Sequence, residues 1–190
     1  MHDRRCLPAL ALFLLCTAAV HGGSKTSIWK MGGDIFVDDA PFGASLHTMG
    51  GDIRIGRAAG PVVAKTMGGN IAVAALAGRR LEAGSMGGNI RVRVVGSGGG
   101  RDIAIHTMGG TVELIVPRDF DARFDVEVKR SDESTESRIE SDIPLTRTVA
   151  EHRGWLHSGR QSIVARKRTS TQPNRVEIST YASGIVIRRE

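Results

Sequence analysis

The chain has 190 residues, 41% of them hydrophobic, and carries a formal net charge of +6 at pH 7. This length predicts one domain with a core of its own, or one repeat array with a cap. Both cysteines, Cys6 and Cys16, precede residue 23, so the rest of the chain can form neither a disulfide bond nor a thiolate metal site. After residue 22 no segment is apolar over the roughly 20 residues that a membrane-spanning helix needs.

Residues 1–22 have the pattern of a secretory signal peptide. Two arginines precede an apolar run, Leu7–Cys16, and Thr17–Ala19 offers the small side chains that a signal peptidase accepts. Leu15 is too large for the position before a lipid-modified cysteine, so lipidation of Cys16 is not expected. We therefore expect an exported protein that works in the periplasm, at the cell surface or in the medium.

A six-residue motif centred on Met-Gly-Gly occurs five times after the signal. Its methionines are separated by 18, 18, 19 and 22 residues, and such near-constant spacing is typical of stacked-repeat proteins. In each unit a short β-branched run precedes the glycines and a second run with alternating apolar residues follows them. Each unit is therefore predicted to contain two short strands and two turns, with the glycines at a corner that needs a positive φ. The copies are Lys30–Ile35, Thr48–Ile53, Thr66–Ile71, Ser85–Ile90 and Thr107–Val112.

Strands that recur at this spacing could form a parallel β-solenoid or an antiparallel sandwich of hairpins. The similarity of the copies favours the solenoid, because coils that stack in register place the same motif position of successive coils one above the other. Two inward apolar columns are then expected, two residues apart along each strand. They are Ile35, Ile53, Ile71, Ile90 and Val112, and Val37, Ile55, Val73, Val92 and Leu114, while Phe36, Arg54, Ala72, Arg91 and Glu113 are expected to point outward.

The sequence predicts an all-β fold, a short parallel β-solenoid of about 18–22 residues per coil over 23–116, with a divergent β capping region over 117–190 in the same domain. The end of the chain contains a degenerate copy of the motif, since Thr180–Ile187 aligns without gaps with Thr48–Ile55. Terminal repeats of a stack usually diverge because their outer face meets solvent. We therefore expect this copy to cap the stack. An open end could also pair with a second copy of the chain through its strand edges.

Opposite charges separate within the divergent region. Residues 131–142 contain five acids and one arginine, whereas 152–176 contain six cations and no acid. An exposed polar loop beside a basic β-hairpin would explain both segments. The alternative is a patch for an anionic envelope polymer; nucleic acid is a less suitable partner, because export separates the chain from the genome and Trp155 alone accompanies the cations. The candidate patch consists of Arg153, Arg160, Arg166, Lys167, Arg168 and Arg175.

Two ladders of equivalent side chains invite a metal-binding interpretation. The acids and amides of the fifth motif position could bind calcium, but each coil offers only one such side chain, so hydrogen bonds to neighbouring backbone groups are favoured. The methionines could bind copper through their thioethers, but an apolar residue before a corner most simply fills the core beneath it. We therefore predict neither a metal nor a cofactor. The ladders are Asp34, Asp52, Asn70 and Asn89, and Met31, Met49, Met67, Met86 and Met108.

Histidines and catalytic motifs offer little support for an enzyme. His47 and His106 occupy matching positions, but three coils separate them by roughly 14 Å, too far to share an ion. His152 and His157 lack a carboxylate in a recognisable pattern. The chain contains no Gly-x-Ser-x-Gly, no phosphate-binding loop and no His-Glu-x-x-His, and no paired acids recur at outward positions of neighbouring coils.

The export signal, the tandem Gly-Gly-Asp-Ile-x-Ile segments, Ser141–Leu145 and the closing Ser179–Ile187 together resemble a bacterial adhesin-like family of β-strand-repeat proteins. The resemblance covers nearly all of the chain after the signal. It implies a domain of unknown function that forms a short β-solenoid at the cell envelope, where the adhesin label rests on analogy. The methionine at every corner, and Thr111 in place of Asp or Asn, depart from the family pattern, and the family offers no functional residues to transfer.

Two functions of different class follow from these observations. The favoured one is a non-catalytic envelope protein, an adhesin-like structural or binding module for an anionic envelope polymer or a protein partner. The alternative is a carbohydrate-active or other hydrolytic enzyme built on the solenoid. Substrate turnover that depends on a single acid would distinguish the enzyme from the binding module.

Overall fold

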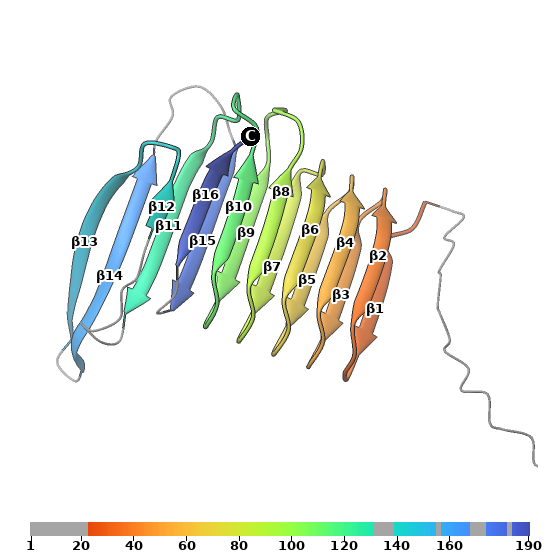
Figure 1. Ribbon diagram of the computed structural model, residues 1–190, viewed down its shortest axis with the longest axis horizontal. Helices are drawn as coiled ribbons and strands as arrows, with labels where there is room; N and C mark the ends of the chain where they lie inside the picture. The colour runs from red at the N-terminus through yellow and green to blue at the C-terminus, as the bar shows by residue number, and fades with distance from the viewer. Residues whose placement is uncertain (1–22, 131–138, 155–156, 168–173, 182–183) are drawn as a thin grey trace, which may run out of the picture.

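The computed structural model describes residues 23–130, 139–154, 157–167, 174–181 and 184–190, and within these ranges the chain forms strands and turns but no helix. The strands form two sheets that share one core (Figure 1). The expected signal peptide and most of the acidic segment lie outside the described ranges. In the described part of the chain, no helix is available that could cross a membrane.

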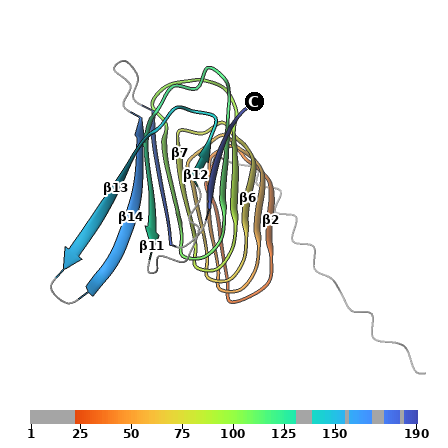
Figure 2. The ribbon, with the colours of Figure 1, turned by 60° about the vertical axis from the view of Figure 1, so that its left-hand side comes forward.

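Sheet A has nine strands and sheet B has seven. From β1 to β10, successive strands alternate between the two sheets. Each coil therefore contributes one strand to sheet A and one to sheet B, as the view in Figure 2 shows. In spatial order sheet A comprises β1 (Thr26–Lys30), β3 (Ala44–Thr48), β5 (Val62–Thr66), β7 (Arg80–Ser85), β9 (Asp102–Thr107), β15 (Arg175–Tyr181), β11 (Arg123–Arg130), β14 (His157–Lys167) and β13 (Thr146–Gly154). Sheet B comprises β12 (Ile139–Ser141), β16 (Ile185–Arg189), β10 (Val112–Val116), β8 (Ile90–Val94), β6 (Ile71–Leu76), β4 (Ile53–Ala58) and β2 (Ile35–Ala40).

Neighbouring coils pair in parallel and in register, which confirms the predicted parallel β-solenoid. In sheet B, Ile35 pairs with Ile53, Ile53 with Ile71, and Ile71 with Ile90, which pairs in turn with Val112. The second predicted column lies two residues further along the same strands. Members of both columns are buried, with none more than 9% exposed.

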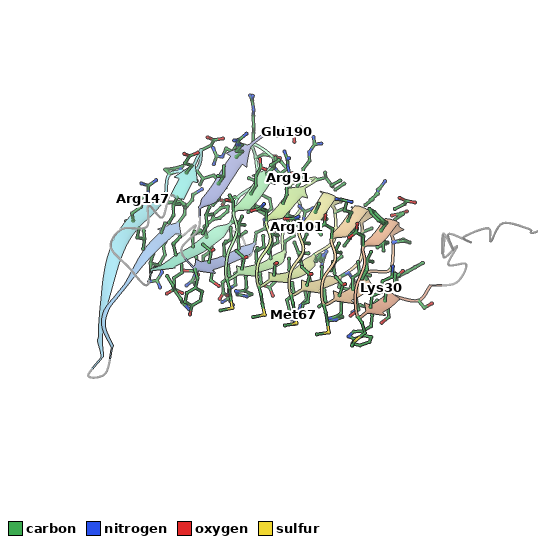
Figure 3. All side chains as sticks on the ribbon, turned by 60° about the horizontal axis from the view of Figure 1, so that its bottom comes forward. Lys30, Met67, Arg91, Arg101, Arg147 and Glu190 are labelled. Carbon is green, nitrogen blue, oxygen red and sulfur yellow. The ribbon has the colours of Figure 1, made fainter. Side chains whose placement is uncertain are left out.

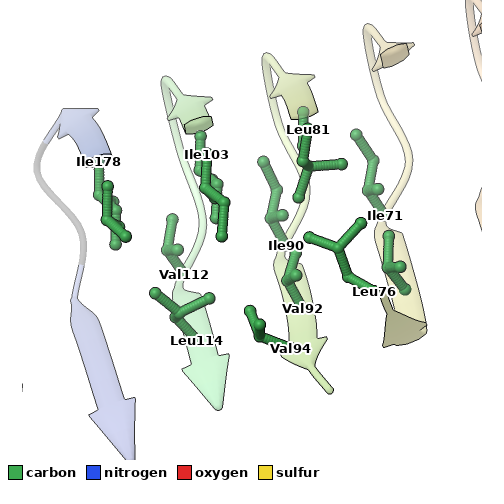
Figure 4. Close-up of a cluster of buried hydrophobic side chains, with 14 of the residues drawn as sticks. Ile71, Leu76, Leu81, Ile90, Val92, Val94, Ile103, Val112, Leu114 and Ile178 are labelled. Atoms are coloured by element: carbon green, nitrogen blue, oxygen red, sulfur yellow. The ribbon is translucent and has the colours of Figure 1, made fainter. Parts of the chain in front are cut away.

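The core between the sheets consists mainly of isoleucine, valine and leucine side chains (Figure 4). Ile103 of sheet A and Val112 of sheet B are both fully buried and lie between the two layers. Burying one such side chain contributes roughly 1.5–3 kcal/mol. Because these columns repeat in every coil, apolar burial between the sheets is the main source of stability in a chain whose described residues contain no cysteine.

The motif residue that points inward is the threonine or serine before the methionine. The Thr66 hydroxyl donates to the Gly51 carbonyl at 2.9 Å and accepts from the Gly69 N–H at 3.1 Å. Because successive side chains of a strand point to opposite faces, Met67 lies on the outside, where it is 48% exposed. The prediction that the methionines fill the core is therefore wrong. The inward positions are Thr48, Thr66, Ser85, Thr107 and Thr180, and the exposed ones are Met31, Met49, Met67, Met86 and Met108.

The second glycine of the motif is required by the stacking of the coils. A Cβ on Gly69 would lie 2.0 Å from the carbonyl oxygen of Gly51 in the preceding coil, much closer than two atoms can approach. A positive φ occurs at Gly33 (82°) and Gly110 (143°), but at no motif glycine of the three middle copies. The expected positive φ is thus confined to the first and last copies. In the others, the missing side chain lets adjacent backbones come within about 4.8 Å of each other.

The acids and amides of the motif form the predicted hydrogen-bonded ladder. The Oδ1 atom of Asp34 accepts the N–H of Asp52, Asp52 accepts that of Asn70, and Asn70 accepts that of Asn89, each at 2.9 Å. Asn89 extends the ladder to the Thr111 N–H at 2.8 Å. The pKa of Asp52 is lowered, first by the hydrogen bond from the Asn70 backbone, an effect that partial burial opposes. Each rung joins one corner to the next coil.

The degenerate copy at the end of the chain lies inside the stack. β15 pairs in parallel with β9 on one side and with β11 on the other, and β16 lies between β10 and β12. This copy is therefore the sixth coil, and the expectation that it closes the stack is wrong. The strands beyond it, β11 to β14, come from earlier in the divergent region. β14 pairs antiparallel with β11 and β13, and Figure 2 shows the β13–β14 hairpin leaning away from the coils.

Two local features hold the sixth coil in place. Buried Asn174 accepts the Arg101 N–H at 2.9 Å through Oδ1 and donates Nδ2 to the Asp121 carbonyl at 2.8 Å, which joins the starts of β9, β15 and β11. The Arg101 guanidinium donates to the carbonyls of Val95 and Gly96, and burial lowers its pKa. These bonds order the 95–101 loop, which connects β8 to β9 and accounts for the longer spacing between the fourth and fifth motif copies.

Candidate functional site

The basic patch predicted near the end of the chain is a mixed-charge surface in its described part. Each of its three described cations lies beside a carboxylate, on β11, on β15 or in the turn before β11. Such exposed pairs neutralise the charge locally and contribute little to stability. The pairs are Arg166 Nε with Asp125 Oδ1 at 3.1 Å, Lys167 Nζ with Asp121 Oδ1 at 3.4 Å, and Arg175 Nη2 with Glu177 Oε2 at 2.8 Å.

The remaining members of that patch cannot be placed as side chains. Arg153 is on β13 and Arg160 on β14, but their side chains are outside the described set, and Arg168 lies outside the described residues altogether. His152 and His157 belong to the same two strands, again without described side chains. The patch of six cations therefore stays a prediction, because the structure describes the side chains of only three of its members.

A second group of cations lies on the outer face of sheet B. Three outward residues in the middle of this face are small: Gly56 on β4, and Ala72 and Ala74 on β6. Arginines on β4 and β8 flank them, so an open hollow of about 750 Å³ forms over the small residues. We call this feature the arginine hollow. Five arginines and three carboxylates line it: Arg54, Arg91, Arg93, Arg188 and Arg189, with Asp38, Glu113 and Glu190.

The arginines of the hollow are held by contacts at its rim. Arg54 lies over the ring of Phe36, 5.2 Å from its centroid, and its Nη2 is 2.8 Å from Asp52 Oδ2. Arg91 Nε is 3.2 Å from Glu113 Oε2, and Arg93 pairs with Glu190. These arginine side chains remain about half exposed or more. Because exposed pairs are weak, the guanidinium groups can exchange a rim carboxylate for an anionic group of a ligand.

Charge runs in the sequence do not reveal this group, because its members lie far apart along the chain. The outward residues between the two apolar columns already included Arg54 and Arg91. Arg93, two residues after Arg91 on β8, and Arg188 on β16 also occupy outward places, since both pair with Ile115 of β10. The signal in the sequence that places these arginines on one surface is their position in the two outward columns of successive coils.

The outer face of sheet A carries the exposed methionines. We call these five side chains, Met31, Met49, Met67, Met86 and Met108, the thioether ridge. Figure 3 shows their sulfur atoms as a row along the edge where Met67 is labelled. Beside the ridge runs an open groove of about 420 Å³ whose lining includes His47, His106, Trp29 and Tyr181.

The two described histidines belong to separate surroundings on this face. His47 is on β3 and His106 on β9, with β5 and β7 between them. His47 Nε2 is 3.5 Å from Ser45 Oγ, whereas His106 Nδ1 is 2.7 Å from Ser179 Oγ. Between the histidines, Lys65 Nζ is 2.5 Å from Glu82 Oε1, and this hydrogen bond is the first cause of a lowered pKa at Glu82.

In the described part of the chain, no group of three or more His, Cys, Asp or Glu side chains is placed to hold a metal ion. The ladder oxygens of Asp34, Asp52, Asn70 and Asn89 instead accept backbone N–H groups of the next coil. Among the residues that line the groove on sheet A, the soft and nitrogen donors are the methionine thioethers and the imidazoles of His47 and His106.

Comparison of the chain with protein-family models, with curated proteins and with solved structures finds no match. The resemblance to the adhesin-like family thus stays a prediction. The two outer faces, one rich in arginine and the other in methionine, are the features from which a function can be argued.

Proposed function

We propose that the protein is an exported, non-catalytic binding module of the cell envelope, adhesin-like in holding an anionic polymer, and that the polymer lies in the arginine hollow. The observation that carries this proposal is the hollow itself, with five arginines around a floor of small residues. Guanidinium groups bind carboxylates and phosphates in a planar, bidentate manner, which makes arginine well suited to such ligands.

The shape of the hollow favours a polymer over a small anion. Its lining residues come from β2, β4, β6, β8, β10 and β16, six neighbouring strands of sheet B. At about 4.8 Å between strands, the hollow extends for roughly 24 Å, which is long enough for several sugar units. Phe36, 60% exposed at one end of this row, offers an apolar ring face on which a sugar could stack.

Binding to an immobilised acidic polysaccharide tests the proposal. Polygalacturonate serves as the probe and neutral dextran as the control polymer. We expect retention on polygalacturonate that weakens with salt, and an affinity at least about tenfold lower, equivalent to roughly 1.4 kcal/mol, for the double variant Arg91→Gln/Arg93→Gln. The variant removes two guanidinium groups and leaves Glu113 and Glu190 to repel the polymer.

The matched control is Arg166→Gln/Lys167→Gln, which removes the same charge from the patch suggested by the charge runs. Equal affinity of this control and the unaltered protein supports the arginine hollow, whereas a loss confined to the control would move the site to β14. Absence of salt-sensitive retention on polygalacturonate would refute the polymer proposal. Release of reducing ends from the same polymer would instead favour the alternative, a hydrolytic enzyme.

A further inference from the structure

The thioether ridge has a property that packing does not explain. Its five methionines, of the six in the chain, are between 44% and 67% exposed. At an exposed strand end, the apolar stem of methionine offers nothing that a leucine, threonine or lysine would lack. What distinguishes methionine there is its sulfur atom, a soft ligand for metal ions such as Cu(I).

The backbone places these sulfur atoms at regular intervals. The parallel pairing continues up to the methionines, because the Met49 N–H bonds the Lys30 carbonyl at 3.3 Å and the Met108 N–H bonds the Ser85 carbonyl at 3.1 Å. Neighbouring methionine backbones are therefore about 4.8 Å apart. Thioethers carried by neighbouring coils at this spacing can both reach one ion that lies between them. Methionine, with three rotatable side-chain bonds, can adjust to this distance.

One part of the ridge brings an imidazole beside two thioethers. His106 lies two residues before Met108 and thus on the same face of β9, while its register partner on β7 is Gly84, two residues before Met86. Because Gly84 has no side chain, the space between Met86 and His106 stays open, and the groove lining includes all four residues. The contact of His106 Nδ1 with Ser179 Oγ at 2.7 Å orients the ring for coordination through Nε2.

The ligand set selects the class of ion. Calcium and magnesium require oxygen ligands, and the described residues that line this groove include no aspartate or glutamate. Nearby Lys65 is neutralised by Glu82 at 2.5 Å, so its charge does not oppose a monovalent cation. We propose that the protein binds a soft monovalent metal ion, Cu(I) or Ag(I), through the thioethers of Met86 and Met108 and the imidazole of His106, above Gly84.

Silver nitrate, added to protein labelled with ¹³C at the methionine methyl groups, tests the site without redox chemistry. We expect the methyl resonances of Met86 and Met108 to shift most. In competition with a chromophoric Cu(I) chelator, the variant Met86→Leu/Met108→Leu should bind Cu(I) at least about tenfold more weakly. Leucine keeps the size and apolar character of these exposed positions, so folding and any apolar contact are preserved.

Matched variants separate the ligands from their surroundings. Met31 follows β1, three strands from β7 and four from β9, so Met31→Leu should leave the affinity unchanged. His106→Gln should weaken binding. Gly84→Val should be tolerated by the fold, because an added Cβ would meet only Lys65 Cγ at 3.8 Å. It should nevertheless weaken metal binding, because the valine side chain fills the open space between Met86 and His106. Unshifted Met86 and Met108 resonances, or unchanged affinity in the double leucine variant, would overturn the site. Unchanged affinity in His106→Gln would overturn the three-ligand assignment.

Discussion

The residues of the repeated motif have different tasks, although they recur together. Thr66 joins two coils through its hydroxyl, Met67 faces solvent, and Gly69 leaves room for the carbonyl of the preceding coil. Asn70 then receives and extends the side-chain ladder. Two glycines that look equivalent in the sequence, Gly68 and Gly69, therefore differ in how much substitution they tolerate.

Alanine should destabilise the fold at Gly69 but have little effect on stability at Gly68. The Cβ of Gly69→Ala would lie 2.0 Å from a backbone oxygen, so we expect a loss of about 3 kcal/mol in the free energy of unfolding. In Gly68→Ala the nearest atom, the Met49 carbonyl oxygen, is 3.9 Å away, and the change should stay within about 0.5 kcal/mol. Urea denaturation followed by circular dichroism measures both. Similar losses at the two positions would contradict the stacking explanation.

The methionines show where sequence interpretation failed at the residue scale. Strict alternation from buried Ile105 through Thr107 puts Met108 on the outer face. The preference of apolar side chains for the core predicts the opposite orientation. The threonine can point inward because its hydroxyl is hydrogen-bonded there: Thr107 Oγ1 donates to the Gly88 carbonyl oxygen at 3.2 Å. The methionine that follows it therefore points outward.

At the scale of strands and coils, the Asp52 carboxylate links two neighbouring corners in a pH-dependent way. It accepts hydrogen bonds from both the backbone and the side-chain N–H of Asn70, and these lower its pKa together with Arg54. Its stabilising contribution is therefore fully present above the ordinary carboxyl pKa of about 3.9. It is lost as the pH falls through that value toward the lowered pKa of the folded state.

An Asp52→Asn variant should lack this pH dependence, because an amide can accept the backbone N–H as Asn70 does but cannot ionise. We expect the difference in Tm between the unaltered protein and the variant to narrow as the pH falls from about 6 to about 3. Thermal unfolding over a pH series measures it. A difference that stays constant across this range would show that ionised Asp52 does not stabilise the fold. Arg54→Gln separates the charge contribution from that of the hydrogen bonds.

The strands and their register follow from the sequence because the repeat imposes them locally. Ile53, Ile71 and Ile90 stack because each occupies the same place in its coil. The position of the degenerate copy could not be derived in this way. Its similarity to the motif predicts which strands it forms, but its neighbours depend on contacts with distant segments, such as that of Asn174 with Arg101, 73 residues away.

At the scale of the whole molecule, the two ends of the stack differ. Beyond the sixth coil, β11 and β12 continue the sheets, and buried Phe120 and Phe124 meet edge to face with ring centroids 6.5 Å apart. At the other end, β1 and β2 have a neighbour on one side only among the described strands. The first coil also carries exposed aromatic side chains, Trp29, Phe36 and Phe42.

The open end of the stack is a sheet edge at which a second copy of the chain can pair. The Thr26 N–H bonds the Gly43 carbonyl at 3.0 Å, on the side of β3. Since backbone groups of successive residues in a strand point to opposite sides, the N–H groups of Ser27 and Trp29 point to the outer edge. We therefore expect the protein to self-associate through this edge, in an isologous contact, and sedimentation velocity over a range of concentrations measures it.

Proline at this edge should weaken self-association without unfolding the chain. Ser27→Pro removes an outward N–H but none of the bonds to β3, and proline is tolerated on edge strands for that reason. Its register partner Ser45 lies on β3, between β1 and β5, so Ser45→Pro removes a hydrogen bond inside the sheet and should lower the Tm. If Ser27→Pro self-associates as strongly as the unaltered protein, the contact lies elsewhere; if the unaltered protein is monomeric at all concentrations, the open end does not pair with a second copy.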